Sequence, residues 1–113
     1  MGEAKDMMKE MSDAINASED LKGMLKNWTK IAAYELEGEE PFYVEHKADG
    51  SCEFHEGKPE KASFTFIAPS DLWVKILKGE EDAQKAFFAK KYKITGDVMA
   101  TMKLNTVLKK ARG

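Results

Sequence analysis

The sequence predicts an α+β domain in which helices from both ends of the chain pack on one face of a mainly antiparallel, five-stranded sheet. Three observations support this fold class. Apolar residues repeat at helical spacing near both ends of the chain, they alternate with polar residues in its middle, and short turns separate the alternating segments. A sheet with this alternation has one apolar face, so the flanking amphipathic helices are its expected cover.

The N-terminal segment is expected to form two helices. Apolar residues recur there at intervals of three and four, which predicts an amphipathic helix over residues 3–17. Its apolar positions are Ala4, Met7, Met8, Met11 and Ile15. Either Ser18 or Asn16 is suited to cap a second, shorter helix, because both side chains accept hydrogen bonds from first-turn N–H groups. The apolar residues of that helix are Leu21, Met24 and Leu25.

Between residues 28 and 69 the apolar spacing changes to two, which predicts four β-strands. Their same-face residues are Ala32, Tyr34 and Leu36 in the first strand, Phe42, Val44 and His46 in the second, Cys52 and Phe54 in the third, and Ala62, Phe64, Phe66 and Ala68 in the fourth. The Asp49-Gly50 pair favours a tight hairpin, because these residues tolerate positive φ. Four strands joined by short turns imply an antiparallel meander.

Residues 69–108 carry much apolar surface and no reactive group, so this segment is interpreted as a binding surface. Pro69 ends the fourth strand, and Ser70 and Asp71 are N-cap residue types at the start of a helix. Leu72, Trp73, Ile76 and Leu77 share one face of that helix. A further helix ends in Phe87-Phe88, and Tyr92 and Ile94 mark a fifth strand. Packing of the core is the alternative role of the apolar helix face.

The C-terminal helix has a less regular pattern. Asp97 is its expected cap, and Val98, Met99 and Met102 share one face. Leu104, Val107 and Leu108 lie on the other side of an ideal helix, so either the helix bends near Asn105 or both of its faces are covered. Because methionine adapts to variable apolar shapes, Met99 and Met102 either line a binding surface or fill the core.

Composition excludes several classes of function. The chain has 113 residues, which is the size of a single domain, and residues 1–113 are expected to form one. Its 18 basic and 20 acidic residues give a net charge of −2, which provides no electrostatic basis for binding nucleic acid. Cys52 is the only cysteine, and neither a signal peptide nor an apolar membrane span is evident. A cytoplasmic protein is therefore expected.

No enzyme, metal or cofactor site is expected. His46 and Cys52 should be neighbours across the hairpin, but a nucleophile pair also needs an orienting group and an oxyanion site. Alternation places His55 on the opposite face, which argues against a three-ligand metal centre. Glu80, Glu81 and Asp82 are explained by a favourable position at a helix N-terminus. Catalytic residues, metal ligands and cofactors are accordingly predicted to be absent.

The order of elements and several local segments resemble the sterol carrier protein type 2 lipid-transfer domains. The resemblance covers residues 21–108, and its motifs are distinctive in combination. The matching segments are Asp71-Leu72-Trp73-Val74-Lys75-Ile76-Leu77-Lys78-Gly79-Glu80, Asp82, Ala86-Phe87-Phe88, Lys91-Tyr92-Lys93-Ile94-Thr95-Gly96-Asp97 and Ala100-Thr101-Met102-Lys103-Leu104. The Asp49-Gly50 hairpin and the apolar strand before Pro69 also resemble the family.

The resemblance implies a five-stranded antiparallel sheet and, between sheet and helices, an apolar tunnel for fatty acids, acyl-CoA or sterols. It also implies non-enzymatic lipid binding and transfer. The residues predicted to contact lipid are Phe64, Phe66, Leu72, Trp73, Ile76, Leu77, Phe87, Phe88, Val98, Met99, Met102 and Leu104. Lys90, Lys91 and Lys93 could meet a lipid head group or an anionic membrane surface, and a solvated lysine face is the alternative.

Two functions from different classes stay open at this point. The first is a carrier that takes an apolar lipid ligand and passes it to a membrane or an enzyme. The second is an interaction or scaffolding domain that forms a homodimer or docks on a partner enzyme. For this second function the contact surface would be the stripe of Met7, Met8 and Met11 or the C-terminal apolar face. In neither case is nucleic acid a partner.

Overall fold

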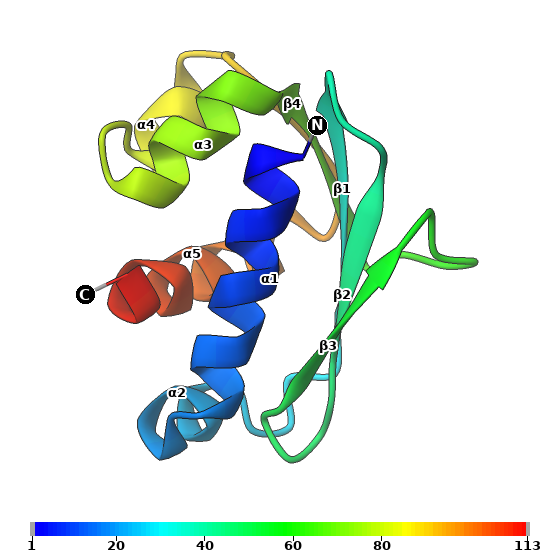
Figure 1. Cartoon of the computed structure of the whole chain (residues 1–113), viewed down its shortest axis with the longest axis vertical. Helices are drawn as coiled ribbons and strands as arrows, with labels where there is room; N and C mark the ends of the chain where they lie inside the picture. Colours follow the sequence, from blue (N-terminus) through cyan, green and yellow to red (C-terminus); the bar gives the residue numbers. More distant parts are fainter. Residues whose placement is uncertain (1, 113) are drawn as a thin grey trace.

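The computed structural model describes residues 2–112 and contains a helical layer on one face of a five-stranded sheet (Figure 1). The strands are β1 (Ile31–Glu37), β2 (Phe42–His46), β3 (Cys52–Glu56), β4 (Phe64–Pro69) and β5 (Lys93–Gly96). The helices are α1 (Glu3–Asn16), α2 (Glu19–Met24), α3 (Ser70–Lys78), α4 (Ala83–Phe88) and α5 (Val98–Arg112). The predicted α+β class with a mainly antiparallel sheet is confirmed. No helix in the described range combines the length and apolarity needed to span a membrane.

The predicted meander of four strands is wrong, because β4 does not follow β3 in the sheet. The strand order is β3-β2-β1-β4-β5, and β4 pairs with β1 in parallel, from Ala32 opposite Phe64 to Glu37 opposite Pro69. The other three pairs are antiparallel. The link after β3 extends on the side of the sheet away from the helices (Figure 1). The link between Glu56 and Phe64 is long enough either to turn back and place β4 beside β3, or to cross the sheet and place β4 at the free edge of β1. Local turn residues do not show which of the two the chain adopts.

The sheet has one apolar face, as its alternating sequence predicts. Tyr34, Phe42 and Phe66 are fully buried beneath the helices. Glu45 and Glu53, which point to the opposite face, are opposite each other in the β2–β3 pair. The predicted inward positions of the first four strands are buried, except for the partly exposed Phe54 and for Ala62, which lies before β4.

The helical layer buries one face of each long helix. In α1 the buried face includes Met8, Met11 and Ile15, while Met7 is only partly buried. In α5 the buried face is Ala100, Thr101, Leu104, Val107 and Leu108, at regular helical spacing. α5 therefore needs neither a bend nor a second cover. Its other apolar face, with Val98, Met99 and Met102, is exposed to solvent.

Helix capping follows the sequence at two starts and departs from it at a third. The Ser18 hydroxyl accepts a hydrogen bond from the Leu21 N–H at 3.2 Å, and Asp97 accepts one from the Ala100 N–H at 3.2 Å. Ser70, a predicted cap, is instead the first residue of α3, and its hydroxyl donates to Glu39. The direct run from β4 into α3 leaves Pro69 at the cap position.

A single carboxylate from the β1–β2 turn links the starts of α1 and α3. Glu39 accepts hydrogen bonds from the Ala4 and Lys5 N–H groups, both at 3.0 Å, and one from Ser70. It thus satisfies two of the donors that the first turn of any helix leaves unpaired. The partners are more than 30 residues apart in sequence, so no local motif indicates this cap.

We expect Glu39→Gln to lower the free energy of unfolding by about 1–2 kcal/mol, because a neutral amide is a weaker acceptor than a carboxylate at a helix start. Urea denaturation of the variant measures this loss. Glu40→Gln is the matched control, since the neighbouring Glu40 is exposed. Equal stabilities of the two variants would contradict the role of Glu39 as a cap.

Candidate functional site

The structure divides the predicted lipid-contacting residues between the core and the surface. Phe64, Phe66, Trp73, Ile76, Leu77 and Leu104 are buried, and Leu72 and Phe87 are partly buried. The others are exposed, namely Phe88 (74%), Met99 (76%), Met102 (45%) and Val98 (38%). The predicted set is therefore partly core and partly exposed apolar surface.

Aromatic rings connect the sheet to the helices without a break. The Tyr34 ring stacks on Phe42 at 4.9 Å and on Phe66 at 5.2 Å between ring centroids. Phe66 contacts Trp73 of α3 at 4.7 Å, and Trp73 meets Tyr92 edge-on at 5.6 Å. Tyr34 and Tyr92 belong to this aromatic layer but are not among the predicted lipid contacts, although their alternating positions in the sequence indicate that they point inward.

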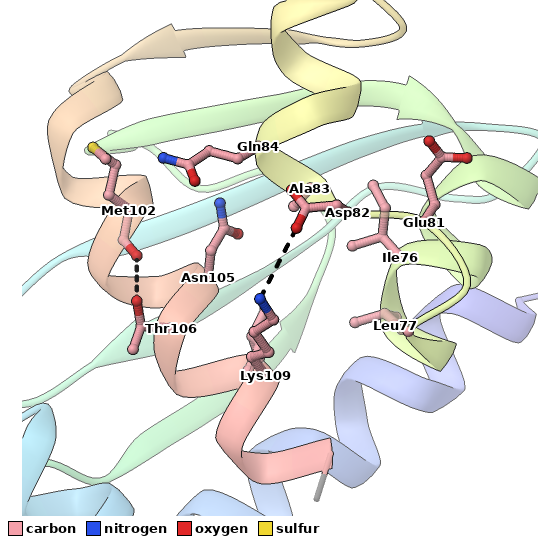
Figure 2. A pocket seen from close by; sticks show the side chains of 12 residues that line it. Ile76, Leu77, Glu81, Asp82, Ala83, Gln84, Met102, Asn105, Thr106 and Lys109 are labelled. Atoms are coloured by element: carbon pink, nitrogen blue, oxygen red, sulfur yellow. Dashed lines mark hydrogen bonds and ion pairs between the residues drawn. The ribbon is translucent and has the colours of Figure 1, made fainter.

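A pocket of about 370 Å³ lies between α3, α4 and α5 (Figure 2). Ile76 and Leu77 of α3 line it on one side, and Met102 of α5 lines it on the other. The remaining lining residues are Gly79, Glu81, Asp82, Ala83, Gln84, Asn105, Thr106, Leu108 and Lys109. The structure therefore brings three of the predicted lipid-contacting residues together in one pocket. Such a volume lies within the range of small-molecule sites.

Polar groups surround this pocket. Lys109 reaches across it toward Asp82, and their charged atoms are 3.9 Å apart (Figure 2). Asp82 also caps α4 by accepting a hydrogen bond from the Lys85 N–H at 2.9 Å. That backbone hydrogen bond lowers the pKa of Asp82, with a smaller contribution from Lys109. The pocket is consequently apolar along α3 and charged where α4 faces α5.

The predicted head-group lysines line a different groove, of about 470 Å³. Lys90, Lys91 and Lys93 meet Lys58 there, beside the ends of β1 and β4. Glu35, Glu37 and Glu39 line the same groove. Lys91 pairs with Glu81 at 3.1 Å, and Lys58 lies 3.9 Å from Glu35. The lysines are thus gathered together, but among carboxylates.

His46 and Cys52 are cross-strand neighbours, as the hairpin predicts. Burial lowers the pKa of His46 to about 4, and neither of its ring nitrogens has a hydrogen-bond partner. Burial also raises the pKa of Cys52, whose thiol donates to the Ser12 carbonyl at 3.6 Å. The pair is accordingly held as a neutral imidazole and a thiol, and the thiolate that nucleophilic catalysis needs is disfavoured.

On the outer face of the sheet, Glu45, Glu53 and His55 place potential ligand atoms within 4.8 Å of one another. His55 and His46 lie on opposite faces of the sheet, as alternation predicts. The Lys47 ammonium already donates to Glu53 at 2.6 Å, and that hydrogen bond lowers the pKa of Glu53. His55 lies 3.2 Å from the same carboxylate. We interpret this partly exposed cluster as a surface ion-pair network.

Comparisons with known proteins place this fold in a family. The sequence model of the SCP-2 sterol transfer family matches residues 8–109. The solution structure of sterol carrier protein domain 2 of Helicoverpa armigera matches with a TM-score of 0.66 and 26% identity, over 93% of this chain and 87% of that one. The UbiJ-SCP2 ubiquinone synthesis protein matches with a TM-score of 0.71 and 13% identity, over 91% and 85%.

The same fold occurs as a small part of a larger enzyme. The sec-alkylsulfatase Pisa1 from Pseudomonas sp. matches 78% of this chain with a TM-score of 0.64 and 16% identity, but only 14% of the sulfatase chain. A comparison with curated protein sequences finds no match. The family match covers most of the residues that build the sheet, the helical layer and the pocket, and so this chain belongs to the SCP-2 sterol transfer family.

Proposed function

We propose that this chain acts as one lipid-binding domain that carries an apolar ligand, such as a fatty acid, an acyl-CoA or a sterol-like lipid, without catalysing a reaction. Domains of this family bind apolar lipids and are generally not catalytic. The observation that carries the proposal is the pocket between α3, α4 and α5, in which exposed Met102 and buried Leu77 line one space. That space thus joins an exposed apolar side chain to a buried one.

Transfer of lipid chains into such a site is favourable because each methylene removed from water contributes about 0.8 kcal/mol. The apolar walls supply this free energy, and a few polar groups are enough to orient the ligand. We propose that the walls extend into a tunnel between the sheet and the helices when α3 and α5 move apart. Phe66, Trp73 and Leu104, which are buried in that layer, would then become tunnel walls.

We further propose a transient contact with an anionic membrane surface. Phe88 is 74% exposed, and Lys90, Lys91 and Lys93 follow it closely in sequence. An exposed aromatic ring enters the lipid head-group region, while neighbouring lysines are attracted to anionic lipids. A cytoplasmic protein could deliver its ligand through such a contact, and the single buried cysteine fits a reducing compartment.

A second candidate function is that of an accessory domain, which acts through a homodimer or a partner enzyme. The match to a small part of a sulfatase favours this alternative, because there the fold is attached to a catalytic chain. In that case the exposed residues Val98, Met99 and Met102 would form the contact surface. Size-exclusion chromatography with light scattering distinguishes a stable homodimer from a monomeric carrier.

The carrier proposal is tested by purifying the protein under native conditions and identifying the extracted lipids by mass spectrometry. A fluorescent fatty acid then reports binding in solution. We expect Met102→Glu to weaken binding about tenfold, because a carboxylate beside the ligand chain must lose its hydration. Lys103→Gln is the matched control, since it changes the charge equally at an exposed neighbouring position outside the pocket.

Two outcomes would contradict carriage. The first is the absence of co-purified lipid together with no binding of the fluorescent fatty acid. The second is equal binding by the Met102→Glu and Lys103→Gln proteins, which would exclude the pocket as the place where the ligand binds. Binding that is lost only in the Met102→Glu variant would support both the function and its location.

A further inference from the structure

Two polar groups in the aromatic core have no hydrogen-bond partner. The Tyr34 hydroxyl and the Trp73 indole N–H are both inaccessible to solvent, and both side chains are 0% exposed. A buried donor without a partner costs about 1–3 kcal/mol, and native proteins retain few of them. A phenylalanine at either position would supply much of the same apolar ring without this penalty. The presence of these two polar atoms in the core therefore needs an explanation.

The two groups come from opposite layers of the fold. Tyr34 projects from β1 of the sheet, Trp73 projects from α3, and their rings meet edge-on with centroids 5.8 Å apart. Phe66 contacts both rings, at 5.2 Å from Tyr34 and 4.7 Å from Trp73. The unpaired donors thus lie where the sheet and the helices face each other, which is the region proposed to open around a ligand.

The pocket and this region share one helix face. Ile76 and Leu77 line the pocket, and Trp73 lies three and four residues before them on α3. Residues at this spacing are neighbours on a helix, one turn of about 5.4 Å apart. In the opened state proposed above, a ligand that enters past Ile76 and Leu77 would reach Trp73 first and Tyr34 next.

The chemistry of the two groups determines which kind of ligand atom they can bind. An indole N–H can only donate a hydrogen bond. Burial, together with the nearby Cys52 thiol, raises the pKa of Tyr34 far above its usual value, so its hydroxyl keeps its proton and can donate as well. Both groups therefore suit an acceptor, which in a lipid is an oxygen atom.

The surroundings select against a charged acceptor. Within the described part of the chain, the buried polar residues are Ser12, His46 and Thr101, and no lysine, arginine, aspartate or glutamate is buried. A carboxylate drawn into this interior would have no cation to pair with, and burying an unpaired charge is far more costly than burying a neutral carbonyl or hydroxyl.

We infer that the Tyr34 hydroxyl and the Trp73 N–H form an internal polar site for the oxygen atom of a neutral lipid, such as a ketone, an ester or an alcohol. This inference rests on the proposed carrier function and narrows its ligand class. An ionised fatty acid would keep its carboxylate at the pocket mouth and make no use of the internal site. A plain hydrocarbon would leave both donors unpaired.

The experiment compares three probes with chains of 16 carbons: 2-hexadecanone, hexadecane and palmitate. Binding to delipidated protein is followed through Trp73 fluorescence in a Trp28→Phe background, which leaves Trp73 as the only tryptophan. We expect Tyr34→Phe to weaken binding of the ketone about five- to tenfold, which corresponds to loss of one hydrogen bond. Affinities for hexadecane and palmitate should change less than about twofold.

Tyr43→Phe is the matched control, because Tyr43 belongs to the neighbouring strand β2 but stacks on His55 of the outer face. It should leave the affinity for all three probes unchanged. A second measurement needs no ligand. Tyr34→Phe should raise the melting temperature of the delipidated protein by a few degrees, since it removes an unpaired buried hydroxyl.

The outcomes separate this inference from the carrier function. If hexadecane and palmitate bind but Tyr34→Phe affects ketone and hydrocarbon equally, the internal polar site is wrong and the carrier stands. A melting temperature lowered by Tyr34→Phe would also overturn the site, because the hydroxyl would then have a partner in the folded protein. If none of the probes binds, the carrier proposal and the polar site fall together.

Discussion

Replacement of Gly50 by alanine should destabilise the protein by about 3 kcal/mol or more, which is a large part of the stability of a domain of this size. Gly50 has a φ of +91°, a backbone conformation that side chains other than hydrogen rarely permit. A Cβ atom at this position would lie 2.0 Å from the Lys22 carbonyl oxygen and 2.7 Å from its carbonyl carbon. These are backbone atoms of α2, so no side-chain rotation can relieve the contact.

Hydrogen bonds hold the β2–β3 hairpin against the region around α2. The hairpin therefore cannot move away from the Lys22 carbonyl without losing some of these bonds. The Asn27 N–H donates to the Ala48 carbonyl at 2.8 Å, and Asn16 exchanges two hydrogen bonds with the Cys52 backbone, each at 2.8 Å. Moving the hairpin away to make room for a methyl group would disrupt these bonds. Strain at positive φ and overpacking each contribute about 1–3 kcal/mol.

Gly57→Ala is the matched control for this prediction. Gly57 has nearly the same φ, +94°, but a Cβ there would meet no atom within 4 Å. Its replacement should therefore cost only the backbone term, about 1 kcal/mol. Guanidinium denaturation measures the free energy of unfolding of both variants. The difference between their losses is the contribution of the contact with α2. Similar losses of stability in the two proteins would contradict the close approach of the hairpin to α2.

Acidification should remove about 3 kcal/mol of stability through His46 alone. The folded protein holds this imidazole neutral, since burial lowers its pKa to about 4 from an ordinary value of 6.5. The unfolded chain takes up a proton as the pH falls below about 6.5, whereas the folded protein takes it up only near pH 4. The free energy of unfolding therefore decreases between these two values and is independent of this group at lower pH.

Urea denaturation at intervals from pH 7 to pH 4 measures this effect. The carboxylates whose pKa is lowered, such as Glu53 and Asp82, lose their stabilising contribution only as the pH falls below about 4.5. A loss of stability between pH 6.5 and 4.5 is therefore due to protonation of histidine. His46→Leu should abolish the decrease between pH 6.5 and 4.5. His55→Gln, on the partly exposed outer face, should retain it. A pH dependence that survives His46→Leu would exclude His46 as its source.

Much of the fold could be predicted because its causes are local. The placement of Tyr34 and Leu36 on either side of Glu35 and the helical spacing of Met8, Met11 and Ile15 each indicate a buried face without knowledge of the rest of the chain. Asp97 was predicted as a cap for the same reason, since it acts on an amide three residues away. The family resemblance added the likeness to lipid carriers, which the family match confirms.

The candidate site was predictable only in part. Ile76, Leu77 and Met102 were predicted as lipid contacts, and the structure brings them together in one pocket. The lysines predicted to hold a head group lie in a separate groove instead. Residue type and spacing show that a side chain is apolar or charged, but the pocket arises from the relative placement of three helices that are separated in sequence.

The sequence by itself determined the approximate position of each helix and strand, which face of α1 and of the sheet is buried, and to which family the chain is similar. Only the tertiary structure decided that β4 joins the free edge of β1, that Glu39 caps a helix 35 residues away, and that Tyr34 and Trp73 meet with unpaired donors. The physical reason is the range of the interactions. Periodicity and capping act within a few residues, whereas strand order, long-range caps and the partners of buried polar atoms depend on how distant segments pack.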